Sequence, residues 1–122
     1  MTATLTTLTI TMGLIFFIVG LLFWIFPPRK INSIYGYRTS SSKRNLDTWT
    51  IANKYSATIM IIQGFILTII GLTTLLFPDS GAIGTAVGFV LFISSIVILA
   101  VATEKHLDKL FDKEGNRKSV AL

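Results

Sequence analysis

Three long apolar runs, separated by short polar segments, dominate the hydrophobic pattern of the chain. Residues 5–26, 57–77 and 82–102 contain no charged side chain. A helix needs roughly 20 residues to cross the hydrocarbon core of a bilayer, which is about 30 Å thick. Because each run meets this length, the pattern predicts an all-α integral membrane protein with three transmembrane helices. We expect the helices to form a single membrane domain over residues 1–122.

Prolines, serines and apolar spacing set the expected ends of the helices. The proline pair at 27–28 ends the first helix, because proline lacks a backbone donor and clashes with the preceding turn. The serine run at 40–42 offers an N-cap, so the second helix starts near the water and enters the membrane later. Leu107 and Phe111 share one helical face and extend the third helix into the charged tail. The predicted helices cover residues 5–26, 43–77 and 82–113, with a loop at 27–42.

Positive charge is concentrated in two segments. The chain has 11 lysines and arginines against 6 acidic residues, a formal net charge of +5. The basic residues lie at 29–54 and 105–118, two segments that share one side of the membrane in a three-helix chain. The positive-inside rule therefore predicts a cytoplasmic loop and C-terminus, and an external N-terminus. Basic residues beside membrane helices face lipid phosphates, so we expect membrane lipids, and no nucleic acid, as partners.

The residue types used by enzymes and metal sites are scarce. The chain has no cysteine and one histidine, and Asp47 is the only acidic residue between the first two runs. The sequence contains no nucleophile–base pair, glycine-rich phosphate loop or carboxylate cluster. We therefore expect no catalytic residue, no metal site and no cofactor. The runs also lack ionisable residues, which disfavours transport driven by a buried carboxylate.

Small and polar residues within the runs are candidates for helix contacts. Gln63 either hydrogen-bonds to another helix or forms a polar lining below the first loop. Gly64 and Gly71 are seven residues apart and share one face of the second helix. Gly84 and Gly88 form a G-x-x-x-G pattern, which lets two helix backbones approach closely. We expect these glycines to be packing positions, and a homodimer through the third helix is the corresponding expectation for assembly.

A basic and aromatic segment follows the first run. Residues 35–39 read YGYRT, and a helical stretch with Trp49 and Asn53 comes soon after. Trp49 and Asn53 are four residues apart, so they lie on one helical face. With Tyr37 and Arg38 they form an array suited to hold an anionic or carbonyl group through the guanidinium and the rings. The alternative is anchoring at the membrane interface, with arginine on phosphate and rings among the headgroups.

The same residues carry a resemblance to a known family. The segment NSIYGYRT, followed ten residues after its threonine by a tryptophan and then by an asparagine, resembles the signature of the SdpI family. The resemblance covers roughly residues 31–77 and the layout of the flanking helices. The matching positions are Asn32, Gly36, Arg38, Thr39, Trp49 and Asn53.

The resemblance implies a function and a location. SdpI proteins are bacterial membrane proteins named for immunity to a secreted, sporulation-linked killing peptide. A multi-pass protein of the bacterial cytoplasmic membrane, protecting its host from a pore-forming or depolarising peptide toxin, is therefore implied. In the namesake system the protein also recruits a transcriptional repressor, which implies signal transduction through a cytoplasmic regulator. Fuller members carry additional membrane helices, and this chain resembles the short core.

We expect an SdpI-like immunity or resistance protein that binds a toxin and is not an enzyme. One alternative is a small transporter or lipid- or solute-handling protein with a cytoplasmic gate. Another is a structural subunit of a larger membrane complex. Because the patch is expected to face the cytoplasm, a toxin would be intercepted within the bilayer, or the patch would act on an internal partner. The expected binding residues are Arg38, Tyr37, Trp49, Asn53 and Gln63, in a loop shaped by Asn32, Gly36 and Thr39.

Overall fold

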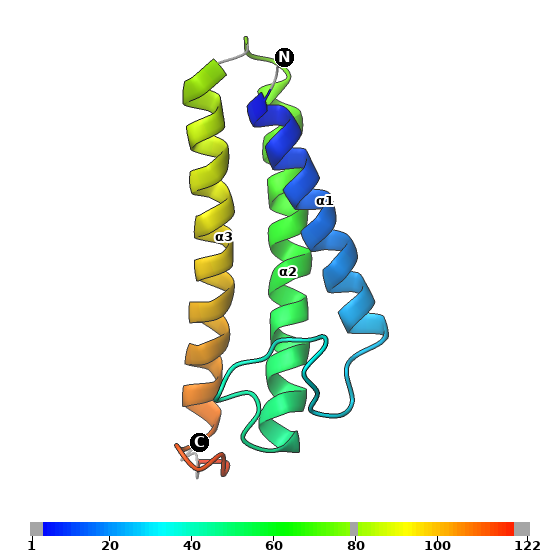
Figure 1. Ribbon diagram of the computed structural model, residues 1–122, viewed down its shortest axis with the longest axis vertical. Coiled ribbons are helices and arrows are strands. Elements are labelled where there is room, and N and C mark those ends of the chain that lie inside the picture. The colour runs from blue at the N-terminus through cyan, green and yellow to red at the C-terminus, as the bar shows by residue number, and fades with distance from the viewer. Residues whose placement is uncertain (1–3, 79–80, 119–122) are drawn as a thin grey trace.

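The chain forms three long α-helices that run side by side (Figure 1). The computed structural model describes residues 4–78 and 81–118. The helices are α1 (Thr4–Ile25), α2 (Leu46–Thr74) and α3 (Gly81–Leu110). Each is long and apolar enough to cross a membrane, and the described part of the chain contains no strand. The predicted all-α fold with three membrane-spanning helices is therefore confirmed.

The start of α2 differs from the prediction. The helix begins at Leu46, later than the expected residue 43, because Asn45 caps it. Asn45 Oδ1 accepts the Thr48 backbone N–H at 2.8 Å, and Thr48 Oγ1 accepts the Asn45 N–H at 3.1 Å. Ser42, from the serine run expected to supply the cap, closes a turn within the loop instead. The predicted cap is wrong because this reciprocal pair satisfies two free N–H groups at once.

The ends of α2 and α3 also differ from the prediction. The second helix ends at Thr74, before the expected residue 77, because residues 75–77 form a tight turn of backbone hydrogen bonds spanning three residues. The third helix ends at Leu110, before the expected residue 113. There the chain doubles back, and an isolated antiparallel bridge joins Phe111 to Arg117. Both apolar runs are long enough to cross a membrane despite these earlier ends.

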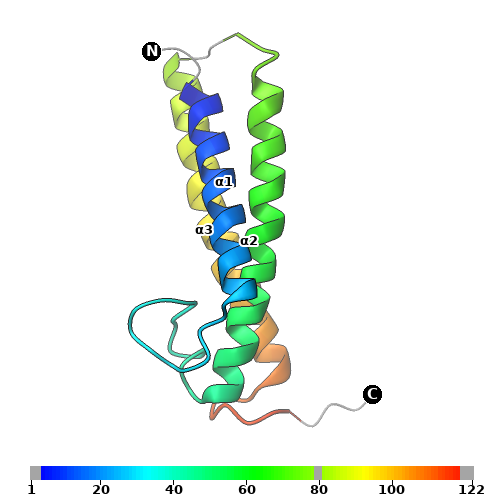
Figure 2. The same cartoon turned by 90° about the vertical axis from the view of Figure 1, so that its right-hand side faces the viewer.

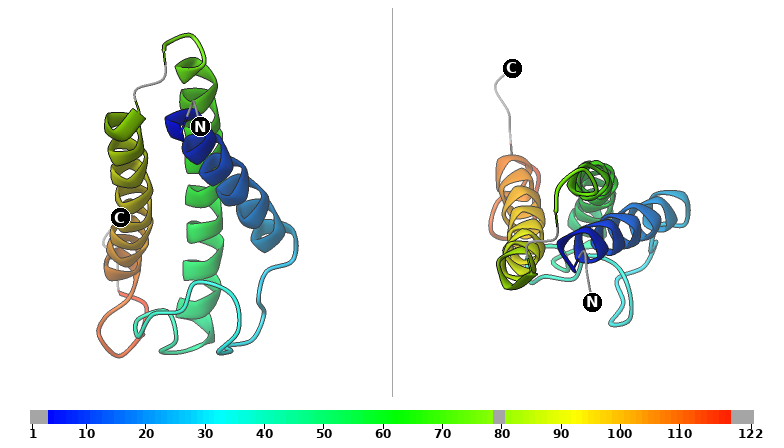
Figure 3. Two further views of the ribbon diagram at one scale, coloured as in Figure 1. Left: turned by 45° about the horizontal axis from the view of Figure 1, so that its top comes forward. Right: turned by 90° about the horizontal axis from the view of Figure 1, so that it is seen from above.

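Glycines allow the backbones of α1 and α2 to touch. A Cβ placed on Gly64 would lie 2.7 Å from the carbonyl oxygen of Gly13, and one placed on Gly71 would lie 2.5 Å from the Ile10 side chain. Both distances are too short for a side chain, so these positions require glycine. Seen end-on in Figure 3, α1 starts between α2 and α3 and then inclines away to one side.

Gly64→Ala is expected to lower the free energy of unfolding by about 1–3 kcal/mol, the usual cost of overpacking a tight contact. The added methyl would push α1 away from α2 along the contact with Gly13. Denaturant titration of the protein in detergent micelles, followed by circular dichroism, measures this. The control Val90→Ile adds one carbon to an exposed position of α3 and should change stability little. An equal loss of stability in the two variants would contradict the close contact between α1 and α2 at Gly64.

Helix α3 contacts both other helices at small or polar residues. A Cβ on Gly88 would lie 2.9 Å from Leu8 of α1, and Gly84 is buried as well. Gln63 Nε2 of α2 donates a hydrogen bond to the Ser95 carbonyl oxygen at 3.0 Å. Gln63 therefore links two helices. Gly88 of α3 lies against α1 of the same chain, so this glycine already has a packing partner within the monomer. The homodimer through α3 stays a prediction.

One end of the bundle carries the inter-helix loop (residues 26–45) and the tail (residues 111–118), and we call it the basic end. Ala52 of α2 is buried there together with Leu107 and Phe111. Figure 2 shows the tail passing below the start of α2. Arg117 in the tail forms a salt bridge of 2.8 Å with Asp47 of α2. The tail and the buried cluster of Ala52, Leu107 and Phe111 therefore hold the start of α2 against the end of α3.

Candidate functional site

The inter-helix loop reaches all three helices. Figure 1 shows it leaving α1, crossing α2 to the lower end of α3, and turning back to the start of α2. Its first anchor is Trp49, whose side chain is 0% exposed. The Trp49 indole Nε1 donates a hydrogen bond to the carbonyl oxygen of Pro28 at 2.6 Å. The proline pair that ends α1 is therefore bound to the first turns of α2.

Asn53 forms the second anchor, one turn further along α2. Its Oδ1 accepts the backbone N–H of Tyr37 at 2.6 Å, and its Nδ2 donates to the Trp49 carbonyl at 2.9 Å. Gly36 lies directly against this amide. It has a φ of 109°, and an added Cβ would lie 2.6 Å from Asn53 Oδ1. Glycine is required here because the positive φ and the lack of space both exclude a side chain.

Asn32 shapes the outer turn of the loop. Its Oδ1 accepts the backbone N–H groups of Ile34 at 2.9 Å and Tyr35 at 2.8 Å. Its Nδ2 donates to the Lys30 carbonyl oxygen at 2.9 Å. Such asparagine turns replace backbone hydrogen bonds where the chain reverses direction. Asn32, Gly36 and Asn53 therefore fix successive parts of one loop backbone.

Glu104 on α3 is the third anchor, and the sequence analysis missed it. Its carboxylate accepts hydrogen bonds from the Tyr37 hydroxyl at 2.7 Å and from Thr39 Oγ1 at 3.0 Å. The Ser41 hydroxyl donates to the other carboxylate oxygen. Three hydroxyl groups from one short segment thus converge on one charge. The only sequence signal was that Glu104 is the first charged residue after the third apolar run.

Tyr37 is held as a hydrogen-bond donor by its surroundings. Burial raises the pKa of its hydroxyl, and the hydrogen bond to Glu104 and the negative charge of that carboxylate raise it further. The deprotonated form would place two negative charges side by side. Tyr37 therefore remains protonated at physiological pH, and the link between the loop and α3 persists.

The four residues predicted to form one binding patch do not share one surface. Trp49 and Asn53 are buried, and their polar atoms are engaged in the contacts described above. Tyr37 points to Glu104. Arg38 is exposed, and its guanidinium donates to the Ser33 carbonyl oxygen. The predicted open array of rings, amide and guanidinium is therefore not formed. Trp49 and Asn53 support the loop from within instead.

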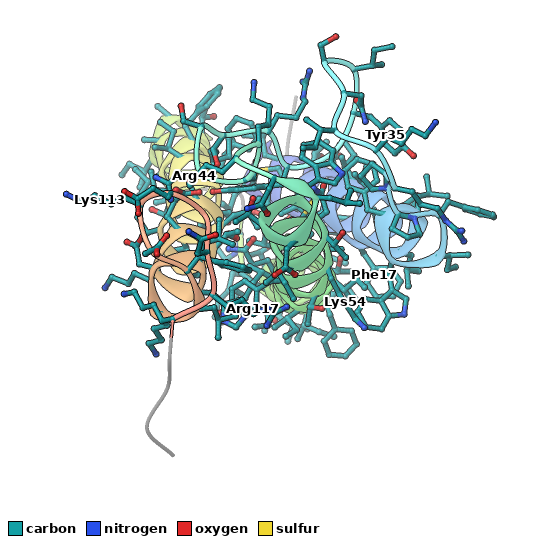
Figure 4. All side chains as sticks on the ribbon, turned by 90° about the horizontal axis from the view of Figure 1, so that it is seen from below. Phe17, Tyr35, Arg44, Lys54, Lys113 and Arg117 are labelled. Atoms are coloured by element: carbon teal, nitrogen blue, oxygen red, sulfur yellow. The ribbon has the colours of Figure 1, made fainter. Side chains whose placement is uncertain are left out.

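The outer face of the loop is apolar and basic. We call Ile31, Ile34, Tyr35 and Arg38 the loop tip. Ile34 is 83% exposed, and the other three are exposed as well. Tyr35 packs against Phe23 of α1 with ring centroids 5.6 Å apart, and Figure 4 shows it at the rim of the basic end. Within the described residues, no group of three His, Cys, Asp or Glu side chains is placed to hold a metal ion.

Comparisons with known proteins agree with the signature residues. The model of the SdpI/YfhL protein family matches residues 29–103. The uncharacterized protein YfhL of Bacillus subtilis (strain 168) is 36% identical over 107 residues, which is 88% of this chain and 92% of that protein. No solved structure matches significantly. The resemblance drawn from the loop and the start of α2 is thus confirmed.

Proposed function

Because the chain belongs to the SdpI/YfhL protein family, we propose that it is an SdpI-like immunity or resistance protein. It protects the bacterial cytoplasmic membrane against a membrane-active peptide toxin, and it acts by binding rather than by catalysis. One observation carries the proposal. The buried signature residues hold the loop backbone, whereas the loop tip stays exposed beside three apolar helices.

The chemistry of the loop tip suits an amphiphilic peptide. Ile31 and Ile34 offer apolar surface, and Arg38 offers a guanidinium whose hydrogen bond goes to the Ser33 carbonyl rather than to a carboxylate. A peptide with apolar side chains and one carboxylate, such as its own C-terminus, complements both features. The anchors fix the loop before binding, so little conformational entropy is lost when the peptide arrives.

The proposed orientation places the basic end in the cytoplasm. All 11 lysines and arginines lie in or beside the loop and the tail, which favours this side for both segments. A toxin that arrives from outside then meets the loop tip only after entering the bilayer. Protection therefore consists of capturing the inserted peptide near the inner leaflet before it assembles into a pore or dissipates the membrane potential.

Arg38→Ala is expected to abolish protection while leaving the protein in the membrane. The exposed guanidinium contacts the loop through a single carbonyl, and ten other basic residues maintain the charge asymmetry. The measurement is survival of a toxin-sensitive bacterium challenged with a panel of membrane-active peptides, with membrane levels matched by immunoblot. Lys43→Ala, in the same loop and also exposed, is the control and should protect. No protection by the native chain against any peptide would refute the proposal.

A further inference from the structure

A groove lies between the C-terminal end of α1 and the first half of α2. Its volume is about 470 Å³, and Phe23, Trp24 and Pro27 form its apolar wall. The groove exists because α1 inclines away from α2 toward the basic end (Figure 3). Its place at the end of the first apolar run puts it where the hydrocarbon core gives way to the headgroups.

Two cations line this groove without a carboxylate partner. Arg29 follows the proline pair, and Lys54 comes from α2. The Lys54 ammonium lies 5.2 Å from the centre of the Trp24 ring. Among the described residues, the ion pair formed is that of Arg117 with Asp47, so neither Arg29 nor Lys54 is neutralised by an acidic residue. The groove therefore combines uncompensated positive charge with an aromatic wall.

We propose that this groove binds the headgroup of an anionic phospholipid, with the phosphate between Arg29 and Lys54. Thr50 also lines the groove. One acyl chain runs from the groove along Trp24 and Phe23 toward the middle of α1. Charge complementarity identifies the class of lipid, because basic pockets between membrane helices attract anionic headgroups and a zwitterionic lipid gains less from two cations.

The lipid site is independent of the proposed immunity function. Figure 4 places Lys54 and Tyr35 on different sides of the α1–α2 pair, and Phe23 of the groove wall packs against Tyr35 of the loop tip. Pro28 connects them, because it lines the groove and its carbonyl oxygen accepts the Trp49 hydrogen bond. A bound lipid therefore contacts the start of the loop at Pro28.

Native mass spectrometry of the purified chain in detergent tests the site. Phosphatidylglycerol and phosphatidylcholine with identical acyl chains are titrated separately. The native protein is expected to retain one phosphatidylglycerol about tenfold more strongly than phosphatidylcholine, since each basic residue adds favourable attraction. No preference between the two lipids would overturn the proposal. Competition by free glycerol phosphate as strong as that by the lipid would also overturn it, because the site would then take a soluble anion.

Matched variants locate the binding. Arg29→Gln with Lys54→Gln is expected to remove the preference, whereas Lys43→Gln with Lys105→Gln removes the same charge from exposed positions elsewhere and should keep it. Lys54→Arg should retain binding, which separates loss of charge from loss of fold. Equal loss of preference in both double variants would show diffuse attraction to the basic end and would refute the groove. Circular dichroism confirms equal helical content in each variant.

Discussion

Trp49→Ala is expected to lower the free energy of unfolding by about 3–5 kcal/mol, the range for truncating a large buried aromatic side chain. The indole is fully buried and donates to the Pro28 carbonyl oxygen. Its removal leaves a cavity beneath the loop and an unpaired carbonyl. Titration with sodium dodecyl sulfate in mixed micelles, followed by far-ultraviolet circular dichroism, measures the change without relying on tryptophan fluorescence.

Trp24→Ala is the matched control. The Trp24 side chain is 47% exposed at the edge of the groove between α1 and α2, so its truncation should cost far less. If both tryptophan variants lost the same stability, Trp49 would not be the anchor of the loop. A large loss in Trp49→Ala alone would fit a buried support and would argue against a role for this side chain in direct contact with a ligand.

Glu104→Ala is expected to release the loop from α3. The change removes the shared acceptor of the Tyr37, Thr39 and Ser41 hydroxyls. Hydrogen bonds to a charged group contribute about 1.5–3 kcal/mol each, and the partial exposure of this carboxylate reduces that value. A total loss of about 3 kcal/mol corresponds to roughly a 100-fold increase in loop opening. The helices themselves should remain folded.

Limited proteolysis with trypsin measures this opening, because the loop contains arginines and lysines. Cleavage after Arg38 is expected to accelerate strongly in Glu104→Ala and to stay at the native rate in Glu114→Ala. Glu114 lies in the tail, and its side chain is exposed. Equal cleavage rates for the native protein and Glu104→Ala would show that the contacts to α3 do not hold the loop.

The three helices could be predicted from the sequence because their signal is local. Each apolar run is long enough to cross a bilayer and lacks charge, which leaves a backbone few alternatives to a helix in hydrocarbon. The exact ends of the helices were harder to predict from the sequence. Capping of α2 depends on the reciprocal contacts of Asn45 and Thr48, and the preceding serines satisfy the same composition rule equally well. Competing caps in one segment cannot be ranked by composition alone.

The residues of the loop could be predicted from the sequence, but their contacts could not. Its signature residues could be found in the sequence, but their role as internal supports depends on burial, which the spacing of Trp49 and Asn53 does not reveal. Glu104 was missed because its contact with Tyr37 spans 67 positions in the chain. The apolar spacing that places Leu107 beside Ala52 brings Glu104 to the loop as well, since both residues lie on the same end of α3.

The signature residues form a scaffold that holds the loop in one shape. Gly36 lies where a Cβ would collide with Asn53, and Asn32 closes the turn that carries Ile34 and Tyr35. The proposed toxin binding relies on the surface that this scaffold displays, an exposed loop tip that combines apolar side chains with Arg38.

Site-specific photocrosslinking shows whether the loop tip contacts the peptide. A photoreactive amino acid is placed at Ile34 in the loop tip or at Phe65 on the exposed face of α2, in cells challenged with the peptide against which the native chain protects. We expect a crosslink to the peptide from position 34 and none above background from position 65. Crosslinks of equal yield at both positions, or from position 65 alone, would contradict recognition at the loop tip.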